Sequence, residues 1–333
     1  MSEQEFIEGG LATLLGADQG AVSIVGVASL GAQRQTLFIE VFDGCIHTSA
    51  VAQIGQAIVG EGTPATTEAA LVTAAGAAGV PVPAVLAATD DPTLVGGPVM
   101  VSERIDGLTI PRQILRAIDA NVDADSGDRL ANDCGLALAA LHVVEVDALP
   151  DSVPRPGEDG AHLGYVDELE TVMAELSEPM PVMRIGFNWL RRNAPNAATE
   201  PSLVHGDLRN GNIVVSDHRL AAVLDWELAH VGDPIEDLAW LCLRTWRFGN
   251  DDRPVGGFGS LDALRSGYEA ALGVWDDERF RWWTVARTAW WGIGLARQAA
   301  AFRGGLTDSI VLAASGRRVV ELEYDLLRLI EER

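Results

Sequence analysis

The stretch that most constrains this chain is a polar loop followed directly by a short hairpin, within residues 203–227. The loop reads LVHGDLRNGN, and the segment that overlaps it and continues reads NIVVSDHRLAAVLDWE. Two β-rich apolar runs, 213–215 and 220–224, flank the polar turn 216–219. Apolar runs around a short polar turn are typical of a β-hairpin, so the sequence predicts one here.

The expected hairpin register brings oxygen-bearing side chains together at its open end. If the turn is centred between His218 and Arg219, Asn212 lies opposite Asp225, with Cα atoms roughly 4.5–5.5 Å apart. Asp207 lies five residues before Asn212, in the loop that feeds the same end. Carboxylate and amide oxygens suit Mg²⁺, and a metal beside phosphate oxygens suits phosphoryl transfer.

Length and charge narrow the class of protein. A chain of 333 residues is long enough for two lobes, and its net charge of −24 argues against nucleic acid or an anionic membrane as a partner. All 24 basic residues are Arg, so a permanently charged side-chain contact to phosphate must come from Arg. Three widely spaced cysteines and an acidic N-terminus that does not resemble a signal peptide favour the cytoplasm. The oligomeric state is not predicted.

The order of expected elements predicts an α+β fold with two lobes. Residues 21–105 read as several strands with one helix over 63–79, which gives a small β-rich lobe at 1–104. The larger lobe, 105–333, is expected to be mostly helical, with helices over 129–146, 165–193 (one or two), 234–248, 260–272, 278–302 and 308–331. The uncharged stretch 69–89 is interrupted by GVPVPAV and does not predict a membrane span.

Several quoted segments resemble a known family. LVHGDLRNGNIVV, VLDWELAHVGDPIEDLAWLCLRTWRFG and LAALH are similar to the aminoglycoside phosphotransferase/choline-kinase group of small-molecule kinases. WWGIGLARQAAAFRGG and AASGRRVVELEYDLLRLI resemble the branch of that group associated with acyl-CoA dehydrogenases. The resemblance implies a two-lobe, protein-kinase-like fold that binds ATP and Mg²⁺ between its lobes and phosphorylates a hydroxyl group of a small molecule.

The resemblance also implies roles for individual residues. Asp207 would be the catalytic base or would orient the accepting hydroxyl group. Asn212 and Asp225 would be ligands of Mg²⁺. His205 and Asp237 would brace the catalytic loop.

Further roles are implied for the nucleotide. The backbone of Glu103 to Ile105, within VMVSERIDG, would contact adenine as the hinge, and SLGAQRQT, with Gly31 at its tip, would cover the phosphates.

One expected residue is missing. Kinases of this shape use a cation on the third strand that pairs with a glutamate on the helix of the small lobe. Glu68 can be that glutamate, but the third strand, within CIHTSAV, has no Lys or Arg. Arg34 is the better candidate for the cation and His47 the weaker one, because an unperturbed His is mostly neutral at pH 7. A degraded kinase fold that only binds a ligand is therefore the alternative.

Two other questions stay open. A metal-dependent hydrolase could use His205, Asp207, Asp225 and Glu227. Four Trp residues on one expected helix, at 282, 283, 290 and 291, fit either core packing or an aromatic wall for the acceptor. The resemblance favours a hydroxyacyl compound or a similar metabolite over an aminoglycoside as the acceptor.

Overall fold

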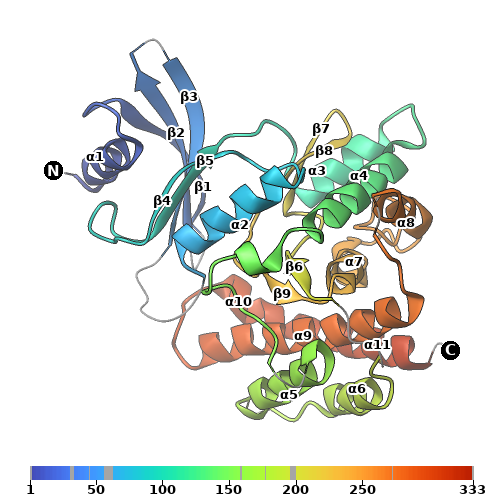
Figure 1. Cartoon of the computed structure of the whole chain (residues 1–333). Coiled ribbons are helices and arrows are strands. Elements are labelled where there is room, and N and C mark those ends of the chain that lie inside the picture. Colours follow the sequence, from blue (N-terminus) through green and yellow to red (C-terminus); the bar gives the residue numbers. More distant parts are fainter. Residues whose placement is uncertain are drawn as a thin grey trace.

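The structure is a computed structural model that describes residues 2–30, 34–44, 46–55, 63–157, 160–176, 178–195, 200–271 and 273–331. An antiparallel sheet forms one end of the molecule, and most helices gather at the other end (Figure 1). The α+β composition predicted from the sequence is confirmed, with the strands concentrated before residue 104.

The sheet of the N-terminal part has five strands in the order β1-β2-β3-β5-β4. Their bounds are β1 Val22–Leu30, β2 Arg34–Asp43, β3 Ile46–Gly55, β4 Val85–Thr89 and β5 Val99–Glu103. Helix α1 (Glu3–Leu15) contributes Ile7 and Leu11 to a core with Leu37, Ile39 and Ala52 of the sheet. Since strand side chains alternate between faces, Thr36 and Phe38 face the opposite side. That side is open to a cleft.

Helix α2 (Ala65–Ala77) is the helix expected in this part of the chain. Pro64 occupies its N-cap position and supplies no side-chain cap. Leu71, Val72 and Ala75 are buried against the large core, which carries Glu68 of the same helix inward.

The remainder of the chain is mostly helical. Its helices are α3 Pro111–Asp119, α4 Ser126–Leu141, α5 Gly160–Ala174, α6 Pro181–Arg192, α7 Ile235–Leu241, α8 Leu261–Ala270, α9 Asp277–Arg303, α10 Ile310–Ser315 and α11 Val319–Glu331. Helix α9, with 27 residues, runs through this part and lies against α5, α6, α7, α10 and α11 (Figure 1). The predicted helix over 234–248 is wrong in extent, because α7 ends at Leu241 and only a short 3₁₀ turn follows.

Two small antiparallel pairs lie among these helices. Strand β6 (Ser202–Val204) pairs with β9 (His230–Gly232), and β7 (Ile213–Ser216) pairs with β8 (Arg219–Val223). Strand β6 ends directly before the polar loop 205–212, and β7 begins directly after it.

The hairpin β7–β8 is confirmed, but its predicted register is wrong. The turn is centred between Asp217 and His218, which both have positive φ, and a bulge follows Val214. Asn212 therefore lies opposite Leu224, whose N–H donates to its carbonyl oxygen at 2.9 Å. Asp225 follows one residue later. The left-handed residues in the turn set this register, since they match the twist of the two strands.

In the described part of the chain, none of the helices is both long and apolar enough to cross a membrane.

A buried ion pair ties the entrance of α7 to α9 and α5. Asp233 accepts hydrogen bonds from Arg279 Nε at 3.0 Å and from His162 Nε2 at 2.9 Å. Burial alone would raise the pKa of Asp233, but these donors outweigh it and bring the pKa to about 2.

We expect Asp233→Asn to lower the free energy of unfolding at neutral pH by about 2–4 kcal/mol, because it leaves a buried arginine unpaired. The carboxylate's contribution is present above its ordinary pKa and is lost as the pH falls through the folded value. The difference from wild type should therefore narrow between about pH 5 and pH 2 in urea titrations. A difference that stays constant over that window would contradict the assignment.

Candidate active site

The loop that connects β6 to β7 is held by one buried carboxylate. Asp237 of α7 is fully buried and accepts the backbone N–H of His205 at 2.8 Å and that of Gly206 at 2.9 Å. His142 Nε2 approaches the same carboxylate at 3.2 Å. These hydrogen bonds keep the pKa of Asp237 below its usual value although burial would raise it.

The ring of His205 is occupied on both sides. Nδ1 accepts the N–H of Asp207 at 3.1 Å, so Nε2 is the protonated nitrogen and donates to the carbonyl of Leu224 at 3.1 Å. Burial lowers the pKa of His205, which keeps the ring neutral. Because both nitrogens are engaged, His205 braces the loop and cannot serve as the metal ligand that the hydrolase alternative requires.

The carboxylate of Asp207 accepts three side-chain hydrogen bonds. Trp240 Nε1 donates to Oδ1 at 2.8 Å, and Arg209 Nε donates to the same oxygen at 3.1 Å. Asn212 Nδ2 donates to Oδ2 at 2.6 Å. A carboxylate with this many donors is held in one orientation. Such a group is well suited to orient a hydroxyl group.

Asn212 and Asp225 offer oxygen atoms beside that carboxylate. Since Asn212 turns its Nδ2 to Asp207, its Oδ1 points elsewhere and can be a ligand. Asp225 has φ of 68°. Burial, and then the nearby Asp207, raise the pKa of Asp225 above its usual value. Crowded, desolvated oxygens of this kind fit a hard divalent cation such as Mg²⁺.

Arg34 occupies the other side of the same space. It starts β2, and its Nη1 lies 2.7 Å from Glu68 Oε2, while its Nε lies 3.3 Å from Glu227 Oε2. Glu68 is buried, whereas Arg34 remains partly accessible. The structure therefore brings Arg34, and not His47, to the glutamate of the helix.

His47 is exposed, and its contacts are with Glu40 and Phe42 instead of Arg34 and Glu68. Its side chain is 54% exposed, it stacks on Phe42, and its Nε2 lies 2.6 Å from Glu40. The lining of the cleft does not include it. The cleft-facing residues of β3 are Val51 and Gln53, so this strand presents an amide and no charged side chain to the cleft.

The cleft between the sheet and the helical part has a volume of about 680 Å³. Glu103, Arg104 and Ile105 border it, as the predicted hinge requires, and apolar side chains such as Val72, Met100 and Val223 line it. Asn212 and Asp225 lie at the same cleft. Gly31, the predicted tip of the phosphate loop, lies outside the described residues.

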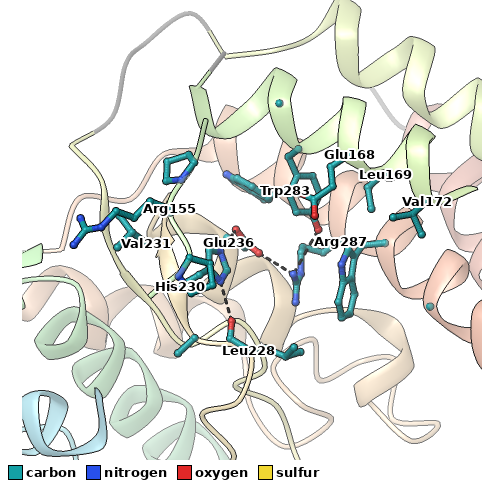
Figure 2. A pocket seen from close by; sticks show the side chains of 18 of the residues that line it. Arg155, Glu168, Leu169, Val172, Leu228, His230, Val231, Glu236, Trp283 and Arg287 are labelled. Atoms are coloured by element: carbon teal, nitrogen blue, oxygen red, sulfur yellow. Dashed lines mark hydrogen bonds and ion pairs between the residues drawn. The ribbon is translucent and has the colours of Figure 1, made fainter. Parts of the chain in front are cut away.

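A second cavity, of about 520 Å³, lies in the helical part between α5, α9 and the segment 227–232. Figure 2 shows Glu168 and Leu169 on one side, with Glu236 and Arg287 facing each other inside. Glu227 lines both this cavity and the cleft, so the two spaces meet at that residue.

The four Trp residues of α9 pack in the interior, and two of them also line the second cavity. Trp282 and Trp283 are buried in the core, each about 1% exposed. Trp283 and Trp290 line the second cavity, while Trp290 and Trp291 also pack against Trp240. Core packing and the cavity wall therefore share the same helix face.

The fold and this arrangement define a kinase-like phosphotransferase. The model of the phosphotransferase enzyme family matches residues 63–283, and the chain belongs to that family. It is therefore a small-molecule kinase by family, as its sequence predicted.

Solved structures of this family share the fold. A thermostable mutant of aminoglycoside phosphotransferase APH(4)-Ia, in complex with AMP-PNP and hygromycin B, matches with a TM-score of 0.66 at 14% identity, over 98% of this chain and 99% of that one. Macrolide 2'-phosphotransferase MphH from Brachybacterium faecium matches with a TM-score of 0.60 at 21% identity, over 93% and 96%. The two-lobe, protein-kinase-like fold is thus confirmed.

The curated relatives are longer proteins. Acyl-CoA dehydrogenase family member 11 of Rattus norvegicus is 33% identical over 177 residues, and family member 10 of Mus musculus is 29% identical over 170 residues. Each alignment covers 50% of this chain, but only 21% and 15% of the respective relative.

Three residues at the site were not found from the sequence. Trp240 lies three residues after Asp237 on α7, so both face the loop, and this spacing was a usable signal. Arg287 lies between Trp283 and Trp290, and an arginine inside an aromatic helix face is a signal of a buried contact. Gln53 gave no signal before the strand register was known.

Replacing Asp225 by Asn tests whether the buried carboxylate of Asp225, which lies near Asp207, destabilises the ligand-free protein. Asn tolerates the left-handed backbone and removes a desolvated charge, so we expect the ligand-free protein to melt about 1–3 °C higher. The stabilisation by Mg²⁺ and ATP should be lost, since the amide is a poorer ligand. Thermal unfolding with and without Mg²⁺-ATP measures both effects.

Asp217→Asn is the matched control, because Asp217 also has positive φ but is exposed at the far end of the hairpin. That variant should respond to Mg²⁺-ATP like wild type. Full Mg²⁺-ATP stabilisation of Asp225→Asn would contradict the metal-ligand assignment.

Proposed function

We propose that this protein transfers the γ-phosphoryl group of ATP, in the presence of Mg²⁺, to a hydroxyl group of a small molecule. The observation that carries the proposal is the grouping of three oxygen-bearing side chains: Asn212 and Asp225 line the cleft, and Asn212 donates a hydrogen bond to Asp207 directly behind them. Phosphoryl transfer needs positioning and charge neutralisation more than covalent chemistry, and this set provides both.

In this proposal Asp207 orients the accepting hydroxyl group and receives its proton as the phosphoryl group is transferred. His205 and Asp237 hold the loop that carries it. Asn212 Oδ1 and Asp225 would hold Mg²⁺, which neutralises charge on the phosphates when bound.

The nucleotide would lie in the larger cleft. Its adenine would contact the backbone of Glu103 to Ile105 between apolar side chains. Arg34 would do the work of the absent third-strand cation, because it pairs with Glu68 and reaches the same space as Asp225. Gly31 and its neighbours would cover the phosphates. We retain the division into lobes 1–104 and 105–333 as part of the proposal.

The acceptor would enter the cavity that meets the cleft at Glu227. Of the described residues, three glutamates line this cavity, but Glu227 pairs with Arg34 and Glu236 pairs with Arg287. Of these three, only Glu168 is left to bind a positively charged acceptor, so the cavity is poorly suited to a polycation. Apolar walls together with arginines instead suit a hydroxyacyl compound or a similar anionic metabolite. The similarity to proteins named acyl-CoA dehydrogenase family members supports the same choice over an aminoglycoside. A cytoplasmic location, expected from the cysteines, belongs to the proposal as well.

Release of ADP with a panel of hydroxyacids, hydroxyacyl thioesters and aminoglycosides tests the function. We expect turnover with a hydroxyacyl acceptor, and a fall in kcat of about 10²–10⁴-fold in Asp207→Asn, because the amide cannot accept the proton. Asp262→Asn, on the exposed start of α8, is the control and should behave as wild type.

Activity that survives in Asp207→Asn would contradict the proposed role. Binding of Mg²⁺-ATP without turnover of any acceptor would instead favour the ligand-binding alternative.

A further inference from the structure

Arg287, near the middle of α9, is a buried charge placed between the cavity and the catalytic loop. It is 3% exposed, and its guanidinium carbon lies 4.2 Å from the ring centre of Trp240 and 4.3 Å from that of Trp290, two indoles that are nearly perpendicular to each other. Its Nη1 donates to Glu236 at 2.8 Å, and Figure 2 shows the two side chains facing each other in the cavity. These aromatic contacts and the hydrogen bond hold the guanidinium in place.

The first contact of Arg287 with the catalytic machinery is through the backbone. Its Nη2 donates to the carbonyl oxygen of Gly206, the residue before Asp207. Gly206 has φ of 77°, and a Cβ there would lie 2.4 Å from the carbonyl oxygen of Leu228. Asp237 holds the N–H of Gly206 from the other side. The peptide group that leads into Asp207 is therefore fixed by Arg287 on its oxygen.

The second contact runs through an indole. The ring of Trp240 lies against the guanidinium of Arg287, and its N–H donates to Asp207 Oδ1 at 2.8 Å. The direction of the Asp207 carboxylate thus depends on the tilt of a ring that rests on the guanidinium. Arg287 therefore supports the backbone of Asp207 through Gly206 and the side chain of Asp207 through Trp240.

The same groups also form part of the cavity wall. Arg287, Trp290 and Glu236 all line the cavity proposed for the acceptor. Arg287 therefore lines the cavity and also contacts the catalytic loop through Gly206, which connects the position of the acceptor to that of Asp207.

We propose that Arg287 is a positioning residue, which holds Asp207 in register with the acceptor cavity through Gly206 and Trp240. The inference rests on the proposed phosphotransfer. Lysine cannot replace it, since an ammonium group lacks the planar fork that donates to Gly206 and Glu236 from two different nitrogen atoms. Misplacement of a reacting group by about 1 Å can cost about 10²-fold in rate.

The test compares Arg287→Lys with Arg279→Lys. Arg279 is the matched control, because it is also buried on α9 and paired with an acid, Asp233, but does not contact the catalytic loop. Both variants should lose thermal stability. Only Arg287→Lys should lose kcat, by about 10–100-fold, with KM for ATP changed by less than about 3-fold. A kcat of Arg287→Lys within about 3-fold of that of Arg279→Lys would overturn the proposal.

A readout that needs no turnover separates this inference from the proposed function. With ¹⁵N-labelled Trp, the Trp240 indole N–H should exchange slowly in wild type and Arg279→Lys, and faster in Arg287→Lys, because its bond to Asp207 is loosened. Unchanged exchange in Arg287→Lys would overturn the inference, whether or not the wild type phosphorylates any acceptor. If the wild type turns over no acceptor, but the Trp240 N–H still exchanges faster in Arg287→Lys than in wild type, only the proposed function is refuted.

Trp240→Phe covers the case in which Arg287→Lys does not fold. Phenylalanine keeps an aromatic ring beside the guanidinium, but it removes the donor to Asp207 together with part of the buried volume of the indole. We expect kcat to fall about 10-fold with a modest loss of thermal stability. Unaltered kcat would overturn the indole's part in the proposal.

Discussion

The site depends on one buried carboxylate, that of Asp237, which accepts the N–H groups of His205 and Gly206. A buried carboxylate without donors would be costly, so the loop must adopt the one shape that presents two successive N–H groups. That shape sends the next residue, Asp207, toward Asn212 and the end of the hairpin. Helix α7 is thereby connected to the catalytic loop by a short, buried link.

A second dependence lies at the cleft, where carboxylates outnumber cations. Burial raises the pKa of Glu68, Asp225 and Glu227, and Arg34 opposes this for each of them. Strand β3 carries neither Lys nor Arg, and the cation that pairs with Glu68 comes from the start of β2. Because adjacent strands lie only about 4.8 Å apart, a cation on β2 can reach the space in front of β3. The remaining excess of acid is what a divalent cation would offset.

Much of the fold followed from local patterns, while the site followed only in part. The hairpin was predictable from its apolar runs, and the nearness of Asn212 and Asp225 survived a register error because both lie at the strand ends. The choice of Arg34 over His47 depended on charge, which is readable from residue type. Gln53 was missed because its role depends on strand register, which no short segment encodes. Trp240 and Arg287 were missed although their helix spacing carried a signal, because the partners that they contact depend on how the helices pack. The end of α7 was misplaced because the backbone leaves the helical conformation at Leu243, which has ψ of 142°.

In the proposed mechanism Asn212 and Asp225 hold Mg²⁺, while Arg34 contacts the phosphates of ATP. A crystal structure with Mg²⁺ and a non-hydrolysable ATP analogue would show both groups of contacts. We expect a metal about 2.0–2.1 Å from Asn212 Oδ1 and from an Asp225 oxygen. We also expect Arg34 to donate to a phosphate oxygen and to remain paired with Glu68. A bound nucleotide with no metal between Asn212 and Asp225, and with Arg34 directed away from its phosphates, would contradict the mechanism.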